Sequence, residues 1–300
     1  MNDKLLVIIL HFGSIEDTLE CLNSLQQYIR SIGLDILVVN NGPDYAIETI
    51  LKEAHPNVIY HYAGRDTGFA AGNNIGLRIG VDRGYEYALL LNNDTVAEQD
   101  FIRPLLDAMR ADAKIAMAGP AMFYYSDKDK LWSLGGKIKW WNGGVGGETD
   151  SGKLSLGRQD TAYLPGACIL VRMRSLLKIG LMNEAYFLGV EEADWAIEAR
   201  RAGFRVVACP QSVLLHKVGM SSQRSPELIY NAVRNRFVFL RCQIPRPIRW
   251  LLAPVVLLSE LRRDFEHRRL CWRAFRDHLK FDRIERRHLD AIREAACAAH

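Results

Sequence analysis

The stretch Leu89-Leu90-Leu91-Asn92-Asn93-Asp94-Thr95 joins an uninterrupted apolar run to a turn rich in side-chain oxygens. A short apolar run of this kind predicts a strand buried on both faces, which is typical of parallel sheets. Residues 85–91 are therefore expected to form a strand whose carboxyl end presents Asn92, Asn93 and Asp94.

Similar apolar runs occur on both sides of this stretch, and amphipathic segments separate them. The predicted strands are 5–10, 35–39, 57–62, 85–91, 115–118, 167–171, 204–208 and 212–215. The predicted helices are 14–28, 47–54, 73–83, 100–110 and 191–202. Alternation of strand and helix is typical of an open, doubly wound and mostly parallel α/β sheet. Residues 131–160 are rich in Gly, Trp and Lys and predict a loop or hairpin.

Length and composition fit one large α/β domain with a helical appendage. The chain has 300 residues, of which 49% are hydrophobic, so it can bury a sizeable core. Its six cysteines include no C-x-x-C pair, which argues against a zinc module or disulfide framework and fits a reducing compartment. No apolar run is long enough to span a bilayer or to act as a signal peptide. We therefore expect a cytoplasmic protein, soluble or peripheral at the inner face of the cytoplasmic membrane.

Positive charge is concentrated at the C-terminal end. From Pro226 onward there are 16 Lys and Arg against 9 Asp and Glu, although the whole chain has a net charge of only +4. We divide the chain into a main domain, 1–225, and a basic helical extension, 226–300. Arginines interleaved with Trp and Leu can lie on an anionic membrane, form a homodimer contact or cover the main domain. We expect no nucleic-acid partner, because no nucleic-acid-binding motif is present.

Three groups of polar residues favour metal-assisted group transfer. Asp94 ends one predicted strand, and His216 follows another. Glu191-Glu192-Ala193-Asp194-Trp195 opens a predicted helix. Asp and His can hold a hard divalent cation, while a carboxylate can take a proton from a hydroxyl. The alternative is that these residues are helix caps and first-turn acids without chemistry.

The order of these motifs resembles that of the family 2 glycosyltransferases, most closely the bacterial rhamnosyltransferase-type members. Residues 4–225 are covered by the resemblance. It is carried by Val38-Val39-Asn40-Asn41-Gly42, Gly68-Phe69-Ala70-Ala71-Gly72-Asn73-Asn74-Ile75-Gly76, Leu91-Asn92-Asn93-Asp94-Thr95, Leu164-Pro165-Gly166-Ala167, the Glu191 cluster and His216. The resemblance implies the GT-A nucleotide-diphospho-sugar transferase fold. It also implies inverting transfer from a dTDP- or UDP-sugar to a hydroxyl of a cell-envelope polysaccharide, a lipid-linked glycan or a related glycoconjugate.

The resemblance also implies roles for individual residues. Glu192 would be the general base, with Glu191 as the alternative, and Asp94 with His216 would hold Mn²⁺ or Mg²⁺. Asp194 and Trp195 would contact the acceptor. The donor nucleotide would be bound by Asn40, Asp66, Gly68, Asn73, Asn92 and Asn93. Lys217 and Arg224 could bind the leaving diphosphate, although solvated surface charge is the commoner role of such residues.

Two positions depart from the family pattern. Asn40 stands where the family usually has a base-binding Asp, and Asp66 where it often has Asn. Two competing functions are a sugar-phosphate nucleotidyltransferase and a sugar-nucleotide-binding protein without catalysis. The nucleotidyltransferase needs a Gly- and Arg-rich loop after the first strand, but residues 11–17 contain no Arg or Lys. Retention of both Asp94 and Glu192 argues against the binding protein.

Overall fold

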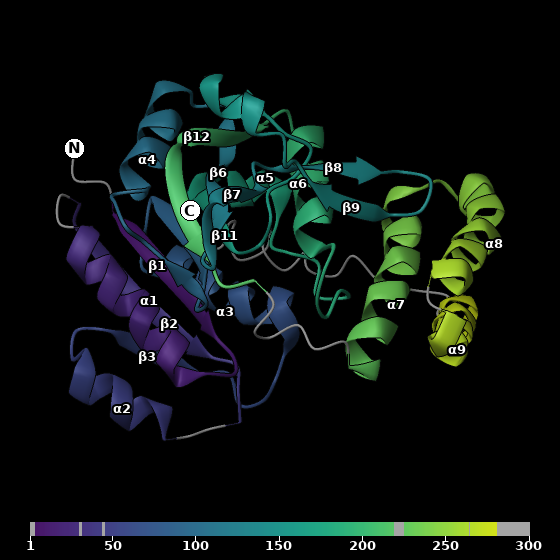
Figure 1. The fold of residues 1–300 in the computed structure, drawn as a ribbon, viewed down its shortest axis with the longest axis horizontal. Coiled ribbons are helices and arrows are strands. Elements are labelled where there is room, and N and C mark those ends of the chain that lie inside the picture. Colours follow the sequence, from purple (N-terminus) through teal and green to yellow (C-terminus); the bar gives the residue numbers. More distant parts are fainter. Residues whose placement is uncertain (1–3, 30–31, 44–45, 219–224, 264, 281–300) are drawn as a thin grey trace.

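The structure is a computed structural model that describes residues 4–29, 32–43, 46–218, 225–263 and 265–280. It is a mixed α/β fold with a helical group at one end (Figure 1). The strands are β1 Leu5–His11, β2 Leu34–Asn40, β3 Ile59–Tyr62, β4 Tyr87–Asn92, β5 Thr95–Val96, β6 Ile115–Tyr124, β7 Asp127–Ser133, β8 Gly136–Lys139, β9 Gly144–Gly147, β10 Gln159–Asp160, β11 Cys168–Arg172 and β12 Arg205–His216. The helices are α1 Ile15–Tyr28, α2 Ile47–Ala54, α3 Gly68–Asp82, α4 Ile102–Ala111, α5 Leu176–Ile179, α6 Glu191–Arg201, α7 Pro226–Gln243, α8 Arg246–Arg263 and α9 Arg268–Lys280.

The main sheet is mostly parallel, as predicted. Its order within the described chain is β10-β12-β6-β11-β4-β1-β2-β3. Strands β3, β2, β1 and β4 are parallel neighbours, and β6 is parallel to β12. Strand β11 lies antiparallel between β4 and β6. The carboxyl ends of β4 and β12 therefore reach the same edge of the sheet.

Strand β1 shows why the sheet is covered on both faces. Its alternate residues Leu6, Ile8 and Leu10 belong to one buried cluster, which also contains residues of α3 and α6. The intervening residues, 5, 7 and 9, belong to a second cluster with residues of α1 and α4. Because successive side chains of a strand point to opposite faces, a continuous apolar run is buried only in a three-layer arrangement.

Helix α3 begins at Gly68, five residues before the predicted start, so the expected glycine-rich turn at 68–76 is part of the helix. A Cβ atom on Gly72 would lie 2.5 Å from Leu10 Cδ1, and one on Gly76 would lie 2.5 Å from Ile8 Cγ2. Glycines normally weaken a helix. Here they allow α3 to approach β1 closely, and this tertiary packing outweighs the local propensity.

Two other predicted segments differ in detail. The separate strands expected at 204–208 and 212–215 form one long strand, β12, with an irregularity in register between Cys209 and Val213. Within the expected loop or hairpin at 131–160, β8 and β9 pair as a hairpin, while β7 pairs with β6. Both pairs are antiparallel hairpins of strands that are consecutive in sequence, so the segment is more regular than a loop.

The helices after Pro226 form a group with its own small core. Residues of α7, α8 and α9 make a third buried cluster that includes Phe237, Val256 and Cys271. The other side of α7 contributes Val238 and Phe239 to the first cluster, so α7 packs against both cores. Among the described helices, none combines the length and apolarity that a bilayer-crossing segment requires.

Candidate active site

The backbone brings Asp94 and His216 together at the edge of the sheet. Asp94 follows β4, and the next two residues, β5, pair antiparallel with the end of β12, with His216 opposite Thr95. The Lys217 amide donates to the Asp94 carbonyl at 2.9 Å. Across this ladder, His216 Nε2 lies 3.1 Å from Asp94 Oδ1. Two side chains 122 positions apart in sequence therefore form one polar pair.

The second ring nitrogen of His216 is available for another ligand or proton. His216 Nδ1 is buried and has no hydrogen-bond partner among the described residues. The Trp132 ring meets the imidazole edge-on, with 4.5 Å between ring centroids. The indole therefore holds the imidazole by packing without using its hydrogen-bonding capacity.

The two candidate bases lie at the start of α6, after an unusual turn. Val190 has φ of +79°, the only positive φ among non-glycine residues of the described chain, and Gly189 before it has φ of +91°. A β-branched residue is strained in this region, and such strain is found mainly at functional sites. The Gly189 amide donates to Glu191, and the Gly166 amide donates to Glu192. The turn thus directs both carboxylates inward.

The environment of the two glutamates favours their protonated forms. Burial raises the pKa of Glu191, and the neighbouring Glu192 charge raises it further. Burial also raises the pKa of Glu192, although its own amide and that of Gly166 oppose the increase. The Oε2 atom of each is buried without a partner among the described residues. Each glutamate therefore keeps one oxygen that can accept a proton.

One cavity of about 340 Å³ unites these groups. Its lining includes Asn92, His216, Glu191 and Glu192. Glu191 is buried, whereas Glu192 is only partly buried and is the more accessible of the two. Asp94 does not line the cavity but reaches it through His216. Acidic groups thus outnumber basic ones here, and an anionic diphosphate requires a cation in such a site.

Two of the expected donor-binding asparagines are engaged in local hydrogen bonds. Asn40, at the end of β2, is fully buried. Its side chain donates to Tyr60 Oη at 3.0 Å and accepts from the Gly42 amide at 2.9 Å. Asn93 Nδ2 donates to Thr18 Oγ1 at 3.0 Å and to two carbonyls of the loop after β1. Neither residue lines the cavity.

The start of α3 is joined to the end of β2 by side chains. Asn41 Oδ1 accepts from the Thr67 amide at 3.0 Å and the Thr67 hydroxyl at 2.7 Å. The exposed Asp66 accepts from the Gly68 amide at 2.9 Å, and Asn73 Nδ2 donates back to the Phe69 carbonyl, which closes the first turn of the helix. Asp66, Gly68 and Asn73 lie outside the cavity lining.

A glycine is required at the first position of α3. Gly68 has φ of +79°, and a Cβ atom there would lie 2.3 Å from the Phe187 carbonyl oxygen. That carbonyl accepts a hydrogen bond from the Phe69 amide at 2.7 Å. This close contact holds the loop before α6 against the start of α3. The contact thereby fixes the position of one wall of the cavity.

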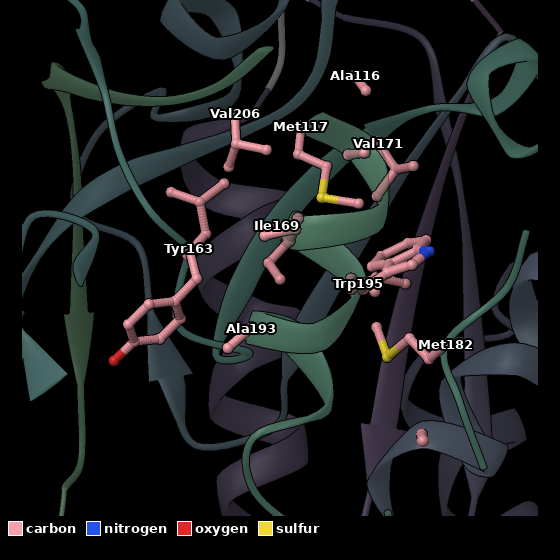
Figure 2. Packing of buried hydrophobic residues seen from close by; sticks show 14 of the residues in the cluster. Ala116, Met117, Tyr163, Ile169, Val171, Met182, Ala193, Trp195 and Val206 are labelled. Atoms are coloured by element: carbon pink, nitrogen blue, oxygen red, sulfur yellow. The ribbon is translucent and has the colours of Figure 1, made fainter. Parts of the chain in front are cut away.

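The structure contradicts the expected stacking of Trp195 on a sugar. Its side chain is 1% exposed and packs among Met117, Ile169 and Met182 (Figure 2). Its indole N–H donates to the Gly180 carbonyl at 2.9 Å. The sequence pattern of residues 191–202 did not reveal this burial. In the fold, however, most of α6 is buried between the sheet and α7, so Trp195 belongs to the core.

Asp194 joins elements together and does not point into the cavity. Its carboxylate accepts from Tyr186 Oη at 3.1 Å and from Gln243 Nε2 of α7. Lys217 also has structural partners, because its Nζ forms ion pairs with Asp17 at 2.5 Å and Glu20 at 2.6 Å. Arg224, the other residue considered for the diphosphate, lies outside the described residues.

The aromatic lining of the cavity and its support by α7 were not predicted from the sequence. Phe69, Tyr124, Trp132 and Tyr163 line the cavity. The only local signal was the cluster of tryptophans that includes Trp132 in an irregular segment. Asn235 of α7 is fully buried, and its Nδ2 donates at 2.8 Å to the carbonyls of both residues 188 and 189, which line the cavity.

Comparisons with known proteins show similarity to glycosyltransferases. Residues 6–180 match the family model described as glycosyl transferase family 2. The chain is 25% identical over 255 residues to the dTDP-rhamnosyl transferase RfbF of Shigella flexneri, a match that covers 80% of this chain and 81% of that protein. It is 24% identical over 257 residues to the low-salt glycan biosynthesis hexosyltransferase Agl10 of Haloferax volcanii, which covers 79% and 76% respectively.

A solved structure shares the fold. The crystal structure of GalNAc-T7 with UDP, GalNAc and Mn²⁺ has a TM-score of 0.63 at 14% identity, and the match covers 77% of this chain and 47% of that chain. The sequence and structure matches confirm the resemblance and the GT-A-type α/β fold expected from it.

Proposed function

Because the chain belongs to glycosyl transferase family 2, we propose that it is an inverting, divalent-cation-dependent glycosyltransferase in which Glu192 is the general base. The observation that carries the proposal is that one cavity is lined by Glu192, Asn92 and His216, with Asp94 within hydrogen-bonding distance of His216. Displacement of a nucleoside diphosphate by a hydroxyl requires a base and cation ligands at one site.

The residues present fit a cation that is shared with the donor. Within the described chain, no three His, Cys, Asp or Glu side chains are arranged to enclose a metal ion. Asp94 and His216 would supply two ligands for Mn²⁺ or Mg²⁺, and such ions commonly complete their coordination with water and phosphate oxygens. When bound, the cation neutralises the diphosphate as it leaves.

Glu192 performs the proton transfer in this proposal. Its carboxylate, in which Oε2 has no hydrogen-bond partner among the described residues, takes the proton of an acceptor hydroxyl. The hydroxyl oxygen then bonds to the anomeric carbon from the face opposite the diphosphate, whose bond to that carbon breaks, so the configuration inverts. Glu191 is less suited to the role because its side chain is more deeply buried. The Glu192 charge also raises the pKa of Glu191, so Glu191 holds its proton more tightly.

The donor and acceptor classes follow from the relatives. One relative is named a dTDP-rhamnosyl transferase, and the solved structure contains UDP, so we propose a dTDP- or UDP-sugar donor. The second relative is named for glycan biosynthesis, which supports a growing polysaccharide or lipid-linked glycan as the acceptor. The cavity's aromatic walls suit this substrate, because the apolar faces of sugar rings pack on aromatic side chains.

The base is tested by turnover. Glu192→Gln removes the proton acceptor at nearly constant shape and should lower turnover by about 10²–10⁴ while donor affinity stays similar. The assay is transfer or hydrolysis from a panel of dTDP-, UDP- and GDP-sugars with Mn²⁺, with the anomeric configuration of the product read by NMR. Glu191→Gln is the matched variant. If Glu192→Gln kept near-normal activity and Glu191→Gln lost its activity, the general base would be Glu191.

The cation ligands are tested by binding. Asp94→Ala should abolish transfer and weaken nucleoside-diphosphate binding in the presence of Mn²⁺, as measured by calorimetry. If the wild-type protein bound the nucleoside diphosphate equally well in EDTA and in Mn²⁺, the cation-dependent part of the proposal would be wrong.

A further inference from the structure

The outer face of α8 is unusually apolar for a surface that meets solvent. Every exposed residue from position 247 to position 258 is apolar: Pro247, Ile248, Trp250, Leu251, Pro254, Val255 and Leu258. Leu251 is 75% exposed and Leu258 55% exposed. Six of these positions follow helical spacing and form one continuous stripe over three turns of α8. The seventh, Trp250, lies at the border of the stripe.

Packing among the described residues accounts only for the opposite face of α8. Ala253, Val256 and Leu257 are buried against α7 and α9. The carboxylate of Glu260 is also buried and pairs with Arg236 at 2.6 Å and with the arginine at 263 at 2.8 Å. A helix that is apolar on both faces normally has a partner on both, and a contiguous exposed apolar patch marks an interaction surface.

Positive charge surrounds the stripe. Arg246 stands exposed at the start of α8, and Arg262 continues the stripe one turn beyond Leu258. The exposed arginines of the neighbouring segment are Arg263, Arg268, Arg269, Arg273 and Arg276. The only acidic side chain on α8, Glu260, is buried. An apolar stripe with a tryptophan at its border and arginines at its ends is the pattern of an interfacial helix on anionic lipid.

We propose that the outer face of α8 docks the protein on an anionic lipid surface. The stripe would enter the boundary between head groups and acyl chains, and the arginines would contact lipid phosphates. The proposal goes beyond the sugar transfer proposed above and does not depend on it, because docking requires no catalysis.

The charge pattern favours lipid over the other partners. A two-fold dimer through this stripe would bring its arginine-bearing ends against one another, since both ends of α8 are basic. The apolar centre of the stripe lacks polar groups that could bind the bases or phosphates of a nucleic acid. An anionic bilayer offers acyl chains to the apolar stripe and phosphate groups to the arginines.

The same group of helices supports the cavity. Helix α7 packs against α8, and Asn235 of α7 holds the loop that carries Gly189 at the cavity wall. A membrane bound to α8 would therefore hold the catalytic domain at the surface in which a lipid-linked acceptor resides.

Vesicle co-sedimentation of the full chain tests the proposal. We expect pelleting with vesicles of phosphatidylglycerol and phosphatidylcholine at about 50 mM salt, and much weaker pelleting with phosphatidylcholine alone or at high salt. A double variant, Leu251→Ser with Leu258→Ser, should lower the partition coefficient at least about tenfold. Arg262→Glu should lower it on the order of tenfold. The matched control is Leu177→Ser, a change of an equally exposed leucine on α5, and it should have no effect.

Three results would overturn the proposal. The first is failure of the wild-type protein to pellet with the anionic vesicles at low salt. The second is pelleting that the double variant leaves unchanged. The third is a dimer in solution that the double variant converts to a monomer, because that result would assign the face to a second copy of the chain. Equal thermal midpoints for all variants exclude misfolding, and sugar-nucleotide turnover measured without lipid reports separately on the proposed function.

Discussion

Replacing Glu191 with glutamine should stabilise the protein above neutral pH and have little effect near pH 5. An ordinary glutamate has a pKa near 4.5, and burial beside Glu192 raises the pKa of Glu191 well above that value. The folded protein therefore holds a proton that the unfolded chain releases. As pH rises from about 4.5 towards the raised pKa, the free energy of unfolding falls by about 1.4 kcal/mol per pH unit for this proton. Glutamine does not titrate, so the variant escapes this loss.

The size of the effect follows from the change in pKa. The pKa of Glu191 is raised from 4.5 to about 8, and each pH unit in this range lowers the free energy of unfolding by about 1.4 kcal/mol. The variant should therefore gain about 4–5 kcal/mol at pH 9, which corresponds to a rise in Tm of about 10–20 °C for a chain of this size. At pH 5 the carboxyl is largely protonated in the folded state, and the two proteins should melt within about 1 °C of each other.

Differential scanning calorimetry between pH 5 and pH 9 checks this prediction. The matched control is Glu86→Gln, the same chemical change at an exposed position, and its Tm should follow the wild type at every pH. A Glu191→Gln curve parallel to the wild-type curve over the whole range would refute the reasoning, because it would mean that Glu191 is charged in the folded state without cost.

Two further predictions concern packing and are checked by urea unfolding. Gly76→Ala should destabilise the protein, because overpacking against Ile8 costs about 1–3 kcal/mol. The higher helix propensity of alanine offsets only about 1 kcal/mol of this cost. Gly80→Ala, which faces the flexible end of a methionine side chain, should be close to neutral. Arg172→Met should cost about 3 kcal/mol, since the buried guanidinium donates to three backbone carbonyls that would lose their partner. The same change at the exposed Arg174 should have little effect; equal losses at both sites would contradict this account.

Much of the fold follows from local patterns in the sequence. Strand β1 and the strand that ends at Asn92 are continuous apolar runs, and such runs are buried on both faces wherever helices cover a sheet. Because carboxyl ends of parallel strands meet at one edge, Asp94 and His216 could be expected near each other. The glutamates at the start of α6 were also found where predicted.

Other features depend on tertiary packing and escaped prediction. The early start of α3 at Gly68 requires the close approach of β1, which no local propensity records. Burial of Trp195 depends on α7 and the sheet covering both sides of α6. The contact of Trp132 with His216 depends on the pairing of β12 with β6, which are distant in sequence, and on the hairpin of β6 with β7. Each of these features is set by residues outside the window that a sequence pattern covers.

The pairing of Asp94 with His216 also affects how the protein becomes active during synthesis. The 122 positions between them take a ribosome about 6–25 s to translate at 5–20 residues per second. Through most of that interval, the nascent chain has strands β1–β4 but neither Glu192 nor the histidine, and the β5–β12 ladder cannot form until its end. An incomplete chain therefore cannot assemble the polar pair, and in the proposed mechanism sugar transfer waits until β12 has emerged and docked.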